Sequence, residues 1–466
     1  MRRDPSFLIS PLAGARALGV LLLLSLVAVA RAGEDAPPPP PPAAAAPPAA
    51  PAAKASTPPG STTLPNVTGN PINEFLFIGT GDLGGWVGLP ADSAFRVGGV
   101  AVGNFTAQLA GGDSIGAINW AGFVVLSFSV DMEKAVGWKG AKFGIAGLQY
   151  NVQAANSAAG SVQGINSAVS VSPNNRTELY NYLYAQNLFD NQLQVVVGKL
   201  IPTMTFGNVA RPDPTDQIGS FNVPSLTGLI YTPIFVVPTM LGRIPGYPDS
   251  AFGFQLTIAP KALERFYLSA GLYDGRMGAN GTNTGMVAPD LAGPLFAIGE
   301  MGGAWRLGSE DYPGQFAVGV WHQSGPLQVG QITESQASGI YAQGSQRLMT
   351  FRPGKDSSGM NMFVQGGWTP SQTNLINASV GGGITVWGPF ASRPRDSYGL
   401  GFSWARLNDR PDAGYGFNAA ELLIQAYAQI QFVGNLFFEP VLTMLPAVGF
   451  GKAPSLSTTL QLTAVF

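Results

Sequence analysis

The sequence contains no cysteine and a single histidine, His322, among its 466 residues. Without cysteine the chain forms neither disulfides nor thiolate metal sites, and one histidine excludes every site that needs two imidazoles. We therefore expect no metal and no other cofactor. A lipase or protease needs a nucleophile activated by a positioned base, and no acid stands beside the run His322-Gln323-Ser324 to complete such a site. We interpret His322 as a rim residue and expect no catalytic activity.

Charged residues are also scarce, at 11% of the chain, where soluble domains usually carry about 25%. Hydrophobic residues make up an ordinary 45%, so uncharged polar residues and 61 glycines stand where charges would be expected. The net charge of −2 leaves no basic field for a nucleic acid, which we exclude as a partner. A surface that contacts lipid needs fewer charges than one in water, so this composition is compatible with a membrane protein.

Long apolar runs are absent after the N-terminus, so no later segment has the roughly 18 apolar residues of a membrane-spanning helix. The one apolar stretch, LGVLLLLSLVAVA at residues 18–30, follows Arg16 and ends among small residues up to Ala32. This pattern is typical of a secretory signal peptide, which we assign to residues 1–32 and expect to be cleaved; an N-terminal membrane anchor is the alternative.

A tract rich in proline and alanine occupies residues 33–65. Such a composition gives an extended chain without a core. We interpret the tract as a periplasmic linker, which either contacts peptidoglycan or is a tolerated leader. Residues 66–94 are an N-terminal segment that leads into the following domain.

From position 95 onwards, apolar and polar side chains alternate, which indicates strands. In 251–260, Phe254 and Leu256 share one face and Gln255 the other. In 421–432, three glutamines and a tyrosine share a face, which suits a wet interior better than a sandwich core. We predict sixteen strands, at residues 95–110, 118–132, 141–153, 177–189, 192–200, 251–260, 265–274, 293–306, 313–323, 337–351, 359–369, 376–388, 397–406, 419–432, 436–445 and 456–466.

The connections between these strands alternate in length, although the alternation weakens near 370–375 and 389–396. Outer-membrane barrels have short periplasmic turns and longer outer loops, and an even strand number allows an antiparallel barrel to close. We therefore predict that residues 95–466 form an all-β, 16-stranded antiparallel transmembrane β-barrel in the outer membrane of a Gram-negative bacterium. The predicted long connections are 154–176, 201–250 and 275–292, and the short ones are 190–191, 260–264 and 434–435.

The chain ends on a strand pattern, SLSTTLQLTAVF at residues 455–466. We predict that this last strand pairs with the first, at 95–110, so that no free edge remains. Phe466 would then lie on the lipid-facing side, at the rim where aromatic residues gather.

Several stretches resemble one family, the carbohydrate-selective porins of the OprB type, in order and spacing from about residue 78 to the C-terminus. They are TGDLGGW (80–86), DMEKAVGWKGAKFGIAGLQ (131–149), ELYNYLYAQNLFDNQLQVVVGKL (178–200), GYPDSAFGFQL (246–256), RFYLSAGLYDG (265–275), FAIGEMGGAWR (296–306), FAVGVWHQSG (316–325), YGLGFSWARLND (398–409) and FFEPVLTMLP (437–446).

This resemblance implies an outer-membrane porin through which sugars and other small hydrophilic solutes diffuse. A C-terminal aromatic also resembles the signal read by the barrel-assembly machinery, so we expect Phe466 to act as an assembly signal. Two positions depart from the family: Leu83 and Ile201 stand where it usually has a tryptophan and an acid. We therefore predict no particular sugar.

Selectivity in such a pore comes from the width of the constriction and the side chains that line it. Ordered loops as long as 201–250 are usually functional, so we expect this connection to fold inward and narrow the pore; a mobile outer loop is the alternative. Its candidate lining residues are Arg211, Asp213 and Arg243.

Charges inside strands are informative because a lipid-facing charge costs about 2–4 kcal/mol near the bilayer midplane. We predict that Lys199, Glu300 and Glu439 line the pore, with a rim position as the alternative for Lys199. Glu300 occupies the same alternate positions of its strand as apolar residues, which we expect to face lipid. We therefore expect a bulge at Gly299 or Gly302 to turn Glu300 inward.

Four aromatic residues fall on the small or polar face of their strands: Tyr267, Tyr273, Trp321 and Tyr427. Aromatic rings can lie against the apolar face of a sugar ring, so we predict that these residues line the pore. For Tyr273, which is near a strand end, a girdle position at the membrane interface is the alternative.

The expected partners are outer-membrane lipid, sugars or other small solutes in transit, and the barrel-assembly machinery. Two alternative functions stay open at this point. One is a general, weakly selective porin, and the other is a structural outer-membrane anchor attached to peptidoglycan through the proline/alanine tract.

Overall fold

The computed structural model describes residues 82–90, 92–169, 173–209, 227–263, 265–280, 291–308, 312–353, 355–356, 358–408, 419–449 and 453–466. The chain divides into two units, residues 1–62 and 63–466, and every described residue belongs to the second. The predicted signal peptide at 1–32 and the whole predicted linker at 33–65 lie outside the described residues, which begin at residue 82. No described helix is long and apolar enough to cross a membrane.

The described part of the second unit contains sixteen strands, and most of them follow the alternation of apolar and polar residues in the sequence. The strands are β1 Phe95–Ala110, β2 Ile118–Asp131, β3 Ala141–Val152, β4 Asn175–Leu188, β5 Leu193–Leu200, β6 Ala251–Ile258, β7 Phe266–Asp274, β8 Leu295–Leu307, β9 Tyr312–Val329, β10 Ile332–Thr350, β11 Gly359–Trp368, β12 Ile376–Trp387, β13 Ser397–Leu407, β14 Ala420–Val433, β15 Leu436–Ala447 and β16 Ser455–Val465.

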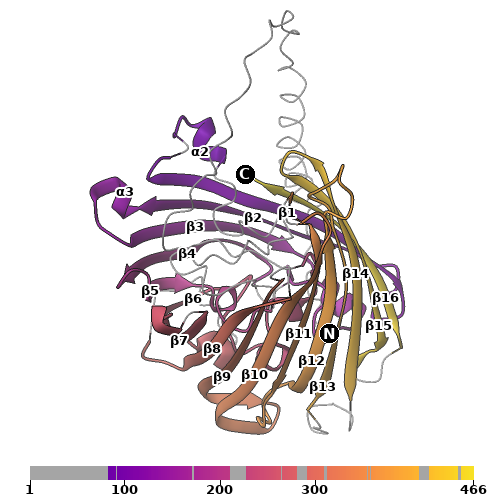
Figure 1. The fold of residues 1–466 in the computed structure, drawn as a ribbon. Coiled ribbons are helices and arrows are strands. Elements are labelled where there is room, and N and C mark those ends of the chain that lie inside the picture. Colours follow the sequence, from indigo (N-terminus) through magenta and orange to yellow (C-terminus); the bar gives the residue numbers. More distant parts are fainter. Residues whose placement is uncertain are drawn as a thin grey trace, which may run out of the picture. The chain divides into compact units, whose positions relative to one another are not determined.

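Each strand pairs antiparallel with its neighbours in sequence, and β1 pairs with β16, so the sheet closes into a barrel (Figure 1). The seam runs from the pair Val100–Val465 to the pair Ala110–Leu456. The last residue continues it, because the backbone N–H groups of Gly99 and Phe466 donate to each other's carbonyl oxygens at 2.7 and 3.0 Å. The predicted 16-stranded barrel and the predicted pairing of the first and last strands are confirmed.

The two faces of the barrel wall differ in chemistry. Along β6, Phe254 points outward and is exposed, whereas Gln255 and Thr257 point inward and are buried. The same alternation leaves large apolar side chains on the outer face of other strands, including Leu268 and Val320. The outer wall is therefore apolar and the inner wall carries most of the polar side chains.

The connections define two ends of the barrel. We call the end with the connections 153–174, 201–250 and 275–294 the loop rim, and the end with Phe466 and the turns 189–192 and 434–435 the turn rim. Tight turns need left-handed backbone, which Phe189, Asp190, Asn191 and Gly434 supply with φ between 53° and 66°.

Short helices occur in the connections: α2 Asp82–Trp86, α3 Met132–Val136, α4 Ala155–Ala159, α5 Arg276–Asn280, η2 Pro202–Met204, η3 Thr232–Ile234, η4 Pro238–Met240 and η5 Lys261–Leu263. Helix α3 shows how the sequence determines where such a helix begins and ends. Asp131 caps its start by accepting from the backbone N–H groups of Glu133 and Lys134 at 3.0 and 3.2 Å, and Gly137 ends it with φ 76°.

The structure differs from the predicted strands most clearly at 324–336, which was predicted as a loop. Strands β9 and β10 continue through this segment and meet in a two-residue turn at Gly330 and Gln331, where Gly330 has φ 58°. A glycine in left-handed backbone at the first turn position suits a tight hairpin. The hairpin lies at the end of the barrel opposite the C-terminus (Figure 1).

The bulge expected at Gly299 or Gly302 is absent. The pairing of β8 with both β7 and β9 is continuous from Phe296 to Gly303. Glu300 points inward because its whole alternate set, which includes Phe296 and Ile298, points inward. The prediction assumed that apolar residues face outward, and it was wrong because these two pack against a connection inside the barrel.

Candidate functional site: an inward-folded connection

The long connection 201–250 enters the barrel after β5, and its first part is fixed by Glu300. The carboxylate of Glu300 accepts from the hydroxyls of Tyr267 and Tyr341 at 2.6 and 2.7 Å, and from the backbone N–H of Gly207 at 3.1 Å. Gly207 has φ 60°, and a Cβ there would lie 2.4 Å from the Met240 side chain. This part of the connection is therefore held tightly against the wall.

The second part of the connection crosses to the opposite strands. The side-chain oxygen of Gln425 on β14 accepts from the backbone N–H groups of Ile230 and Tyr231 at 2.8 and 3.1 Å. On β11, the side-chain amide of Gln365 donates to the carbonyl of Pro233. Because both glutamines are buried on the inner wall, the described parts of 201–250 lie inside the barrel, as we expected.

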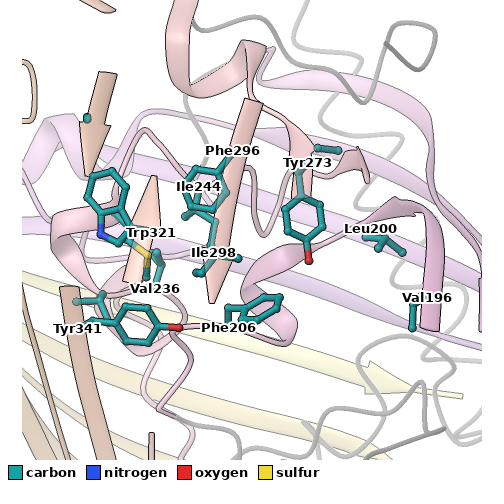
Figure 2. Close-up of a cluster of buried hydrophobic side chains, with 14 of the residues drawn as sticks. Val196, Leu200, Phe206, Val236, Ile244, Tyr273, Phe296, Ile298, Trp321 and Tyr341 are labelled. Atoms are coloured by element: carbon teal, nitrogen blue, oxygen red, sulfur yellow. The ribbon is translucent and has the colours of Figure 1, made fainter. Parts of the chain in front are cut away.

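Apolar packing reinforces these polar anchors. Side chains from the connection sit among inward-facing wall residues, and Figure 2 shows Phe206, Val236 and Ile244 close to the aromatic residues of the wall. All are buried. The wall residues that contact this part of the connection include Tyr273, Phe296, Ile298, Trp321 and Tyr341.

Arg243, predicted to line the pore, ties three connections together. Its guanidinium donates to the Asn374 side-chain oxygen at 3.0 Å and to the backbone carbonyls of Thr373 and Gly278 at 2.8 and 2.5 Å. Only 7% of the residue is exposed. Arg243 therefore supplies hydrogen-bond donors to loop carbonyls at the loop rim.

A buried ionic cluster fixes the end of the same connection. Arg176 on β4 contacts Glu178 at 2.9 Å and Asp249 at 2.8 Å, and Lys199 lies 3.5 Å from the other oxygen of Glu178. The Arg176 guanidinium also lies 4.3 Å from the centre of the Tyr150 ring. Two cations and two anions balance here, so the cluster adds no net charge to the interior.

Lys199 therefore lies at the loop-rim end of β5, with its side chain only 6% exposed. It also donates to the backbone carbonyl of Leu179. Regular alternation along β5 would place Lys199 on the outer face together with Val197. Gly198, between them, has φ 144° and interrupts this alternation. The structure thus gives Lys199 a rim-level position and a buried, ion-paired side chain.

A second connection is anchored by Glu421, at the loop-rim end of β14. Its carboxylate accepts from Ser161 Oγ at 2.9 Å and from the backbone N–H groups of Val162 and Gln163 at 2.8 and 3.0 Å. The side chain is fully buried. Three donors from one loop on a single carboxylate make this another loop anchor on the inner wall.

A third anchor, Glu334, lies at the tip of the β9–β10 hairpin, beyond the ends of the neighbouring strands and so outside the membrane-spanning sheet. Burial would raise the pKa of Glu334. Hydrogen bonds from the side chains of Ser371 and Thr373 and from the backbone N–H groups of Gln372 and Thr373 outweigh burial and lower that pKa to about 2. The connection 369–375 is therefore held by a carboxylate that stays ionised at neutral pH.

The four predicted aromatic residues all lie on the inner wall and are buried. Trp321 stacks on Phe296 with ring centres 6.3 Å apart. The hydroxyl of Tyr273 donates to Gln255 at 3.4 Å, which excludes a place in the outer girdle. Tyr427 shares a 2.6 Å hydrogen bond with Ser397.

Glu439 also points inward, from β15 near the turn rim, and one of its oxygens accepts from Gln461 at 3.5 Å. Arg211 and Asp213 lie outside the described residues. His322 Nδ1 is 2.8 Å from Ser338 Oγ, and His322 pairs with Ala297 near the loop-rim end of β8. Within the described ranges no group of three or more acidic or histidine side chains is arranged to hold a metal.

The sequence predicted that Glu300 and Tyr267 face the interior and that the connection 201–250 folds inward. In the structure Glu300 is hydrogen-bonded to both Tyr267 and this connection. The sequence did not identify Arg176, Glu178, Glu421 and Gln425 as anchors. Part of the signal was present, because Glu178 and Glu421 are charges inside predicted strands, where a lipid-facing position is costly, whereas Arg176 fell in the predicted connection 154–176. What the sequence could not show is which loop each of them holds.

Comparison with known proteins gives the same architecture. The structure is similar to the high-pH structure of Pseudomonas putida OprB, with a TM-score of 0.67 and 16% identity, over 84% of this chain and 99% of that one. The low-pH structure of Pseudomonas putida OprB gives a TM-score of 0.51 at 15% identity, with the same coverage. No curated protein sequence matches the chain.

A family model described as "Carbohydrate-selective porin, OprB family" matches residues 121–444, well over half of the chain. The chain belongs to this family. The match includes all of β3 to β14 and the whole connection 201–250. This porin is accordingly an outer-membrane channel protein whose interior is narrowed by its own connections.

Proposed function

We propose that this porin lets carbohydrates and other small hydrophilic solutes diffuse across the outer membrane. The observation that supports it best is the combination of an inward-folded connection with balanced charges at its anchors. Arg176 and Lys199 are paired with Glu178 and Asp249, so this cluster presents no excess of one sign. A pore without a net field does not favour ions of one charge.

The inner wall also offers uncharged hydrogen-bonding groups. On β1 and β16 these include Asn104, Thr106, Gln108, Ser457 and Thr459, all buried on the inward face. These groups bond mostly to one another, as Thr106 does to Thr459 and Gln108 to Ser457. This part of the wall is therefore polar without charge, which supports the passage of neutral solutes, in keeping with the family of this porin.

Liposome swelling tests this proposal. Vesicles that contain the purified porin should swell quickly in D-glucose and more slowly in gluconate or lysine, which have similar sizes but carry charge. Equal rates for all three would refute the carbohydrate preference and leave a general porin. No swelling in any of them would refute the channel itself.

The orientation and export of the chain belong to the same proposal. Long connections face outward in outer-membrane barrels, so the loop rim would face the exterior and the turn rim the periplasm. Residues 1–32 would be a cleaved signal peptide, and the barrel-assembly machinery would act on the C-terminal strand. Mass spectrometry of the mature N-terminus tests the cleavage directly.

A further inference from the structure

The outer wall of the barrel has a depression that the contacts of the interior do not explain. Its larger part has a volume of about 680 Å³ and lies over β7 to β11. A smaller part of about 420 Å³ lies over β6 to β9, and the two parts share Gly299 and Val320. We call this continuous depression the wall hollow. It opens on the apolar face of the wall, away from the pore.

Small residues form the floor of the wall hollow. Gly299 on β8, Ala342 on β10 and Gly366 on β11 occupy outward positions. Large side chains occupy outward positions beside them, such as Met301 and Ile340, which are 54% and 53% exposed. A Cβ on Gly299 would have its nearest neighbouring atoms 3.9 Å away, so a larger side chain would fit there. The depression therefore comes from the choice of residues and not from crowding of the backbone.

The wall hollow changes in character along the strands. Near the loop rim, the outward positions hold His322 and Ser338, which pair across β9 and β10. Trp368, at the loop-rim end of β11, is 52% exposed, as expected for an aromatic residue at the membrane interface. About 13 Å further from the loop rim, the outward row is wholly apolar and consists of Met301, Val318, Ala342 and Gly366. This order, polar at the interface and apolar below it, is that of a membrane lipid.

We propose that the wall hollow binds one acyl chain of a membrane lipid in the leaflet at the loop rim, with the lipid head beside His322. The hollow is continuous with the lipid-facing wall of an outer-membrane channel. Within a bilayer one apolar surface is not favoured over another by the hydrophobic effect, so packing selects the site. A chain in the hollow contacts the wall beneath it and on both sides, and it makes more dispersion contacts than a chain on the convex wall.

The shape of the wall hollow favours a lipid over a second copy of this chain. Two identical chains meet most often about a two-fold axis, which places the same patch on both sides of the contact. About an axis through the wall hollow, each copy would present its own depression, and both depressions would stay unfilled. Unfilled space forfeits the dispersion contacts of its lining, whereas a flexible acyl chain can enter it.

The polar end of the wall hollow offers the lipid head a hydrogen bond. His322 lines the smaller part of the hollow, and its Nδ1 lies 2.8 Å from Ser338 Oγ. When this hydroxyl donates to Nδ1, the ring proton is on Nε2, which can donate to a phosphate or ester oxygen of the lipid. The hollow thus combines a place for the chain with a donor for the head.

Photochemical cross-linking tests the site. The porin is reconstituted in vesicles of phosphatidylethanolamine that contain a phosphatidylglycerol with a diazirine in one acyl chain, and the adducts are mapped by mass spectrometry of peptides. We expect adducts to concentrate on the residues that line the wall hollow. Ala342→Phe fills the floor and should lower this labelling about fivefold or more, since about ten lost dispersion contacts are worth roughly a factor of five to thirty.

Ala426→Phe is the matched control. Ala426 is an outward alanine on β14 between Leu400 and Leu442, which are exposed on the outer wall, so its replacement should leave the labelling of the wall hollow unchanged. His322→Ala should lower the labelling about threefold through the lost hydrogen bond to the head. If Ala342→Phe fails to fold, as judged by migration on gels with and without heating, Gly299→Leu takes its place with the same expected fall.

Three results would overturn the inference. The first is labelling spread evenly around the outer wall of the unmodified porin. The second is equal labelling of the wall hollow in folded Ala342→Phe and Ala426→Phe. The third is cross-linking of the wall hollow to another porin chain and not to lipid, which would assign it to a second copy. The inference does not depend on the proposed solutes, because swelling in D-glucose is measured separately and should be the same in Ala342→Phe as in the unmodified porin.

Discussion

At the scale of single residues, charged side chains on the inner wall of this porin mainly hold loops. Glu300 and Glu421 on the inner wall accept from backbone N–H groups of connections, and Glu334 does so at the hairpin tip. Arg243, in the connection 201–250, donates to carbonyls of the connections 275–294 and 369–375. A carboxylate that accepts two or more such bonds is a strong local anchor. The shape of the constriction therefore depends on a few buried charges.

Glu300→Ala should loosen the constriction. The substitution leaves the hydroxyls of Tyr267 and Tyr341 and the N–H of Gly207 without their acceptor, at about 1–3 kcal/mol for each group that stays buried. We expect larger current noise and a higher mean conductance in single-channel recordings. Tyr267→Phe, which removes one of the three hydrogen bonds, should give a smaller change. Identical noise in all three proteins would show that Glu300 does not position the connection.

The Glu334 anchor should depend on pH. Its folded pKa of about 2 lies below the ordinary value of 4.5, so its stabilising effect is complete above about pH 4.5 and is lost as the pH falls towards 2. We expect the backbone N–H groups of Gln372 and Thr373 to be protected from hydrogen exchange at pH 6 and less protected at pH 3, after correction for intrinsic rates. Glu334→Gln should show weak protection at both pH values, and equal protection in the two proteins would contradict this role.

At the scale of elements, the alternation of side chains predicted nearly every strand because the wall separates an apolar exterior from a polar interior. The prediction failed where this contrast is missing. The hairpin tip at 324–336 extends beyond the neighbouring strands, so contact with lipid does not require either of its faces to be apolar. Phe296 and Ile298 face inward because a connection, and not water, covers them. Which loop fills the interior is decided by long-range contacts that periodicity does not contain.

The seam between β1 and β16 is the element on which closure depends. Phe466 extends the seam through two backbone hydrogen bonds to Gly99, and its ring lies close to that glycine. We expect Phe466→Ser to lower the amount of folded porin in the outer membrane several-fold, because the aromatic end would no longer guide assembly. The fraction of heat-modifiable porin in membrane extracts measures this.

The same substitution should leave transport by assembled barrels almost unchanged, because Phe466 lies at the turn rim and away from the constriction. Conductance of the small folded fraction provides the comparison. Leu460→Ser, in the middle of the outer face of β16, is a control for the loss of one lipid-facing side chain. An equal loss of folded porin in both variants would argue against a special role of the C-terminal residue.

At the scale of the whole molecule, the barrel closes using residues 95–466 alone, since every strand pairs within this range. We therefore predict that deletion of residues 36–60 leaves the folded barrel, its conductance and its swelling rate with D-glucose unchanged within error. Circular dichroism during heating and planar-bilayer recordings measure these properties. If the deletion also leaves the sedimentation of the porin with purified peptidoglycan unchanged, the tract is not an anchor. Reduced conductance in the deletion variant would instead mean that the tract contributes to the pore.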